Sequence, residues 1–170
     1  MREYNGGKHR SRKEGIMDQE IRSENDTVQG RQLVNEMQIV FDSRSENEGF
    51  ARTAVASFVM PLDPTIDELA DIKTAVSEAV TNCIIHGYEM GPGKIFLDAA
   101  IWDRTLVVSI TDEGRGIADI EKAMEPMFTT KRELERSGMG FSFMEAFMDA
   151  LEVDSVPGRG TRVVMEKEIM

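Results

Sequence analysis

The stretch SEAVTNCIIHGY, residues 77–88, decides how the middle of this chain is interpreted. It closes a segment with apolar residues at helical spacing, which predicts a helix over about 66–86 that Asp63 or Thr65 caps. The following glycines and proline in HGYEMGPG end that helix. Its second face is polar, yet no lysine or arginine occurs between residues 74 and 93. Local ion pairs therefore do not explain this polar face.

Glu78 and Asn82 are the polar residues of this helix that point most clearly to chemistry. They are one helical turn apart, so their side chains project side by side. A carboxylate serves as a base, and an amide oxygen suits Mg²⁺, which takes few protein ligands and leaves positions for phosphate oxygens. A half-exposed helix with ordinary polar residues remains the alternative for either residue taken alone.

The length and composition are typical of one ordinary domain with its own core. The chain has 170 residues, 41% of them hydrophobic, and no apolar run long enough for a membrane span or a secretory signal. Cys83 is the only cysteine, so an intrachain disulfide is excluded and a reducing, cytoplasmic location is expected. Cys83 itself is expected to be a small core residue and not a nucleophile. One cysteine and two histidines also argue against a zinc site.

The charge is strongly negative and unevenly distributed. The formal net charge is −11, and residues 1–31 contain seven basic and six acidic residues, so residues 32–170 carry −12. Such a domain would repel nucleic acid, whereas it suits a basic protein partner or an anion held by backbone N–H groups. Residues 1–31 are polar and predict a disordered tail, which leaves residues 32–170 as the single folded domain.

The order of the predicted elements indicates an α/β fold. We expect a two-layer sandwich, with helices on one face of a mixed, mostly antiparallel sheet. The expected elements are a strand over 33–41, a helix after Ser43 or Ser45, the helix over 66–86, a hairpin of KIFLDAAIW and TLVVSITDE, a helical turn near 117–123, a helix over 139–149, and a second hairpin of LEVDSV and TRVVMEKEI.

Three glycine motifs follow the strands. In TDEGRGI, residues 111–117, Asp112 ends a strand and offers an acceptor for an exocyclic amine, while Gly114 and Gly116 would let a flat ligand approach the backbone. In SGMGF, residues 137–141, the N–H groups before a helix offer a phosphate site. A simple Asp-rich turn and ordinary capping by Ser137 are the alternatives. PGRGT, residues 157–161, suits a hairpin turn equally well.

Taken in order, these motifs resemble a known ATP-binding domain. The series Glu-x-x-x-Asn, D-x-G-x-G, FTTK, G-x-G and G-T is similar to that of DNA gyrase B, heat-shock chaperones, histidine kinases and mismatch-repair proteins, which share the Bergerat ATP-binding fold. The resemblance covers residues 33–168. Within this superfamily, FDSRSENEGFAR and FTTKRELERSGMGF are similar to bacterial anti-sigma factors with serine protein kinase activity.

The resemblance implies ATP and Mg²⁺ as cofactors and assigns a role to each motif residue. Glu78 would be the general base for the attacking hydroxyl, and Asn82 would hold Mg²⁺. Asp112 would bind the adenine amine in a pocket shaped by Gly114 and Gly116 and supported by Thr161. The residues expected to close over the triphosphate are Thr130, Lys131, Arg136, Gly138, Met139 and Gly140. Arg52 matches a position that contacts partner proteins.

The resemblance also implies what the protein works with. Its family members phosphorylate a serine of a small anti-anti-sigma protein and hold a sigma factor, here of the sporulation, sigma-F type. A homodimer is expected, with no direct contact to nucleic acid or membrane. The alternative is a nucleotide-responsive binding module without significant phosphotransfer. A histidine kinase fits poorly, because His9 lies in the expected tail and His86 follows the expected metal-ligand helix.

Overall fold

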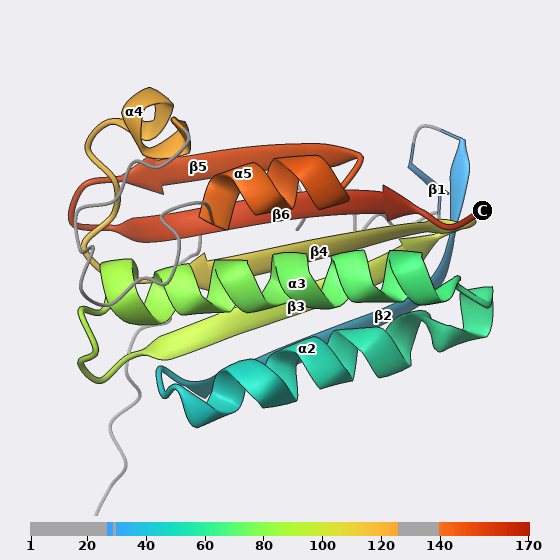
Figure 1. Ribbon diagram of the computed structural model, residues 1–170, viewed down its shortest axis with the longest axis horizontal. Coiled ribbons are helices and arrows are strands. Elements are labelled where there is room, and N and C mark those ends of the chain that lie inside the picture. Colours follow the sequence, from blue (N-terminus) through green and yellow to red (C-terminus); the bar gives the residue numbers. More distant parts are fainter. Residues whose placement is uncertain (1–26, 29, 126–139) are drawn as a thin grey trace, which may run out of the picture.

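Helices α2, α3 and α5 cover one face of a six-stranded sheet in the computed structural model, which describes residues 27–28, 30–125 and 140–170 (Figure 1). The helices are α2 (Glu46–Val59), α3 (Ile66–Asn82), α4 (Ile120–Met124) and α5 (Gly140–Phe147), with a 3₁₀ turn η1 (Met60–Leu62) and a π-helix η2 (Cys83–Gly87). The strands are β1 (Thr27–Val28), β2 (Arg31–Asp42), β3 (Lys94–Trp102), β4 (Thr105–Asp112), β5 (Ala150–Val156) and β6 (Gly160–Glu168). The predicted two-layer α/β sandwich is confirmed.

The strand order is β1-β2-β3-β4-β6-β5, and all its neighbouring pairs are antiparallel. The prediction allowed a mixed sheet. The crossover from β4 through α5 does bring β5 back parallel to β4, but β6 lies between them. No parallel neighbours therefore occur among the described strands.

Local signals in the sequence explain how α3 begins. The Thr65 hydroxyl accepts a hydrogen bond from the Glu68 N–H at 3.2 Å, and the Glu68 carboxylate accepts one from the Thr65 N–H at 2.7 Å. This reciprocal pair is a capping box, so Thr65 and not Asp63 is the cap. The helix was predicted to continue to residue 86, but its last turn changes to π-helical hydrogen bonding at Cys83. Such π-turns occur often at functional sites.

Alternation along the strands places the core between the sheet and the helices. One core cluster contains the buried side chains of Ile95, Leu97 and Ile101 of β3 and those of Ile72 and Val76 of α3. The register of the sheet then fixes one end of the candidate site. Asp112, the last residue of β4, lies opposite Ile95 of β3 on one side and Thr161 of β6 on the other.

Element boundaries differ from the predictions by a few residues. The strand expected over 33–41 extends over Arg31–Asp42, the helix expected over 139–149 is described from Gly140 to Phe147, and the helical turn near 117–123 is α4. Strand β1 and the first residue of β2 lie in the segment predicted as a tail, joined through a turn with Gly30 at a φ of 82°. No helix in the described part of the chain is both long and apolar enough to cross a membrane.

Candidate functional site

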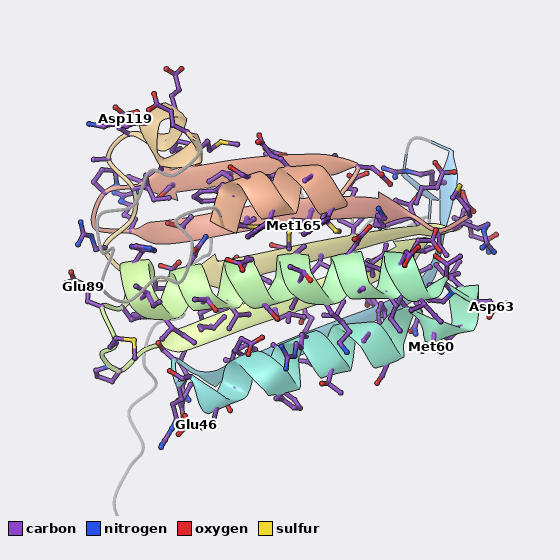
Figure 2. The ribbon with its side chains drawn as sticks, in the orientation of Figure 1. Glu46, Met60, Asp63, Glu89, Asp119 and Met165 are labelled. Atoms are coloured by element: carbon purple, nitrogen blue, oxygen red, sulfur yellow. The ribbon has the colours of Figure 1, made fainter. Side chains whose placement is uncertain are left out.

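A cavity of about 230 Å³ opens where α3 and β4 end. It lies at the end of the molecule where Glu89 and Asp119 are labelled, far from Met60 and Asp63 (Figure 2). Its walls come from the end of α3, η2, the loop after β4, α4, the start of α5 and the start of β6. Five residues predicted from the motifs line it: Asn82, Asp112, Gly116, Gly140 and Thr161.

Glu78 and Asn82 meet the first residue of α5. A Cβ atom added to Gly140 would lie 3.2 Å from Oε2 of Glu78 and 3.2 Å from Oδ1 of Asn82. The carboxylate and the amide therefore point at the same place, and glycine leaves the space beside them free. The N–H groups of the first turn of a helix have no partner within the helix, so this end of α5 favours an anion. A carboxylate, an amide oxygen and the start of a helix thus converge.

Asp112 also lines the cavity, and the residue is buried, with 3% of its surface exposed. The Gly114 N–H donates a hydrogen bond to its Oδ1 at 2.8 Å, and the Cys83 thiol and the Thr161 N–H also donate to the carboxylate. Burial raises the pKa of Asp112, although these three hydrogen bonds oppose the rise. The Asp112 carboxylate is therefore a desolvated hydrogen-bond acceptor, suited to an amine of a bound heterocyclic ring.

Glycines let three segments approach Asp112. A Cβ atom on Gly87 would lie 2.8 Å from the Asp112 Oδ1, so any side chain there would collide with the carboxylate. Gly114 packs directly on the Gly87 backbone, and Gly160, with a φ of 95°, packs on the Asp112 carbonyl. The loop after β4 is tied down where the Arg115 N–H donates to the Gly87 carbonyl at 3.0 Å.

Sequence reasoning missed several lining residues. HGYEMGPG was interpreted as the end of a helix and given no site residue, yet His86 and Gly87 line the cavity, as do Arg115 and Lys122. Cys83 was predicted to be a simple core residue. It is buried, but it also lines the cavity and donates to Asp112. Burial raises the pKa of its thiol, which disfavours the reactive thiolate form.

Some predicted residues lie elsewhere. Arg52 is on α2, does not line the cavity, and its Nη1 is 3.3 Å from Oε1 of Glu48. The residues predicted to close over the triphosphate, other than Gly140, lie outside the described residues: Thr130, Lys131, Arg136, Gly138 and Met139.

The oxygen atoms of Asn82 and Glu78 fit Mg²⁺ better than a metal ion that needs three or more protein side chains as ligands. Within residues 27–28, 30–125 and 140–170, no three His, Cys, Asp or Glu side chains converge on one point. Mg²⁺ does not need such a cluster, because it keeps several waters and binds through one or two protein oxygens together with phosphate oxygens. The Asn82 amide oxygen, with the Glu78 carboxylate beside it, is a donor set of this kind.

Comparison with known proteins places the chain in a family. Residues 41–167 match the histidine kinase-like ATPase domain. The anti-sigma F factor of Thermoanaerobacter sp. is 59% identical over 138 residues, which cover 81% of this chain and 96% of that protein. The anti-sigma F factor of Clostridium acetobutylicum is 55% identical over 136 residues, which cover 80% of this chain and 95% of that protein. The chain belongs to the anti-sigma F factor family.

Membership in the anti-sigma F factor family agrees with the fold. The RsbU and RsbW domains of a Mycobacterium tuberculosis protein, in a crystal structure, superpose on this chain with a TM-score of 0.58 at 21% identity. The match covers 80% of this chain and 32% of that one, and at such low identity it shows the fold alone. The resemblance to bacterial anti-sigma factors is confirmed, and the ATPase domain implies that the chain binds a nucleotide.

Proposed function

We propose that this protein is a cytoplasmic anti-sigma factor that binds a sigma factor of the sigma-F type and uses ATP and Mg²⁺ to phosphorylate a serine of an anti-anti-sigma protein. One observation supports the kinase activity above all others. The carboxylate of Glu78 and the amide of Asn82 converge at the start of α5, with both oxygens 3.2 Å from the place of an added Gly140 Cβ. Phosphoryl transfer needs a base, a metal ligand and a phosphate-binding backbone in this relation.

The cavity orients the nucleotide from its two ends. The Asp112 carboxylate accepts a hydrogen bond from the exocyclic amine of adenine, and the Gly114 and Gly116 backbone lies beside the base. The triphosphate then extends toward the start of α5 and Asn82. Mg²⁺, when bound there, neutralises charge on the phosphate oxygens. The residues between α4 and α5 include Thr130, Lys131, Arg136, Gly138 and Met139, which we propose close over the triphosphate.

Glu78 supplies the base for the incoming serine. Its carboxylate accepts the hydroxyl proton as the serine oxygen bonds to the terminal phosphorus and ADP leaves. Direct transfer from ATP to the serine needs no covalent enzyme intermediate, because positioning and charge stabilisation provide most of the catalysis. The net charge of −11 favours basic partner surfaces. We propose that Arg52 contacts the partners and that the active form is a homodimer.

Radiolabel transfer tests this function. The protein is incubated with Mg²⁺, ATP labelled on its terminal phosphate and a candidate anti-anti-sigma protein, and phosphoserine is measured for wild type and Glu78→Gln. We expect the variant to bind ATP within about threefold of wild type and to lose at least about a hundredfold in transfer, the usual contribution of a general base. Glu145→Gln, an exposed carboxylate on α5, is the matched control and should transfer normally.

Two results would contradict the proposal. Unchanged transfer by Glu78→Gln would refute the assignment of the base. ATP binding by wild type with no transfer to any candidate substrate would favour the alternative function, a nucleotide-responsive binding module.

A further inference from the structure

Ser155 interrupts an apolar pattern at the end of β5. Leu151 and Val153, on the same side of this strand, pack against the core, so the alternation predicts another apolar residue at position 155. A serine is present instead, it is partly buried, and it is not among the residues that line the cavity. We therefore look for its role in the groups that its hydroxyl contacts.

The Ser155 hydroxyl joins two walls of the cavity. It accepts a hydrogen bond from the Ile117 N–H at 2.7 Å, and Ile117 belongs to the loop after β4. It also donates to the Gly160 carbonyl at 3.0 Å and lies 2.9 Å from the Thr161 hydroxyl, both at the start of β6. A serine hydroxyl has one hydrogen and two lone pairs, so these three contacts use its full capacity.

Ile117 and Thr161, which Ser155 connects, belong to the part of the cavity where we propose that adenine binds. Ile117 and Thr161 line it, and the Thr161 N–H donates to the Asp112 carboxylate. Gly160, the third contact, packs directly on the Asp112 backbone. The position of the Ser155 hydroxyl thus affects the position of the Asp112 carboxylate, the proposed acceptor for the ligand. This hydroxyl connects the Thr161 side chain, which lies next to Asp112 in the sheet, to the loop at Ile117.

We propose that Ser155 is a positioning residue for the base of the nucleotide: it joins the loop after β4 to β6 and so holds the two walls between which the base lies. This inference rests on the proposed function for the identity of the ligand. The connection between the walls, by contrast, is a property of the protein without ligand. The two can therefore be tested separately.

The test compares Ser155→Ala with the conservative variant Ser155→Thr. In ligand-free protein, the Ile117 amide should exchange slowly with solvent in wild type, at least about tenfold faster in Ser155→Ala, and slowly again in Ser155→Thr. Calorimetry should show ATP bound about tenfold more weakly by Ser155→Ala, which corresponds to one or two lost hydrogen bonds, and within about threefold of wild type by Ser155→Thr. The transfer rate at saturating ATP should not change.

Ser109→Ala is the matched control. Ser109 is a buried strand serine, with 1% exposed, whose hydroxyl accepts a hydrogen bond from the Arg162 side chain at 3.0 Å. Removing this hydroxyl should lower the melting temperature but leave ATP affinity and Ile117 exchange as in wild type. Unchanged ATP affinity and unchanged Ile117 exchange in Ser155→Ala would overturn the inference. Equal weakening of ATP binding by Ser109→Ala would also overturn it, because the effect would then be general destabilisation.

The same experiment separates this inference from the proposed function. Failure of wild type to bind ATP would refute the proposed function. Slow exchange of the Ile117 amide that depends on the Ser155 hydroxyl would still support the connection between the two walls. Exchange at the same rate in wild type and Ser155→Ala would refute that connection.

Discussion

The substitution Gly140→Ala should separate the stability of this protein from its activity. The added Cβ would lie 3.2 Å from the Glu78 Oε2 and 3.2 Å from the Asn82 Oδ1, whereas ordinary contacts begin at 3.4 Å. Both neighbours must move by a few tenths of an ångström. The atoms nearest the added Cβ are the ends of flexible side chains, so the movement costs little folding free energy.

Alanine is also the better helix former at this position. It favours a helix over glycine by up to about 1 kcal/mol, which for a chain of this size raises the melting temperature by about 2–4 °C. The melting temperature of Gly140→Ala should therefore stay level or rise. Phosphotransfer should fall about tenfold to a hundredfold, because small displacements of a base and a metal ligand have large effects on rate.

Gly49→Ala is the matched control, since Gly49 lies inside α2 and nothing is within 4 Å of an added Cβ. It should raise the melting temperature by a similar amount and leave ATP binding unchanged. The assays are thermal unfolding by circular dichroism, calorimetry with ATP and Mg²⁺, and radiolabel transfer. Full activity of Gly140→Ala, or a melting temperature several degrees below wild type, would refute the reasoning about this contact.

Three further predictions concern the N-terminal cap of α3 and two buried carboxylates. Thr65→Ala removes the capping box and should cost about 1 kcal/mol, a drop of about 2–4 °C in melting temperature, with ATP affinity unchanged. Hydrogen bonds from the Met170 and Thr65 N–H groups lower the pKa of Glu68 below 4.5, so its contribution to stability is present above pH 4.5 and is lost as the pH falls further. The melting temperatures of wild type and Glu68→Gln should accordingly differ at pH 6 and converge in acid; a constant difference would contradict this. Burial raises the pKa of Asp112 above 3.8, so calorimetric ATP affinity should begin to fall on acidification at a pH above that of an ordinary aspartate, and a titration that follows 3.8 would count against it.

Local signals in the sequence were enough to predict the elements on which the site is built. The spacing of apolar residues in α3, a cap at Asp63 or Thr65, and the hairpin of β3 and β4 depend on near neighbours. The structure contains all three, with Thr65 as the cap. The strand position of Asp112 was predicted in the same way. The side-by-side arrangement of Glu78 and Asn82 likewise follows from helix geometry alone.

Contacts between distant segments could not be predicted. The role of Gly87 depends on how closely η2 approaches the end of β4, and the role of Gly140 depends on where α5 begins beside α3. The order of β6 and β5 depends on the crossover through α5, which a list of predicted elements does not determine. Ser155 resembled any turn-proximal serine, because its three partners come together only in the folded sheet.

A structure with Mg²⁺ and a non-hydrolysable ATP analogue tests the central claim most directly, because it locates both ends of the nucleotide at once. The account predicts the exocyclic amine of adenine at hydrogen-bonding distance from the Asp112 carboxylate, and the metal on the Asn82 amide oxygen with Glu78 beside the terminal phosphate. A nucleotide bound outside this cavity, or one with its phosphates at Asp112 and its base at the start of α5, would contradict it.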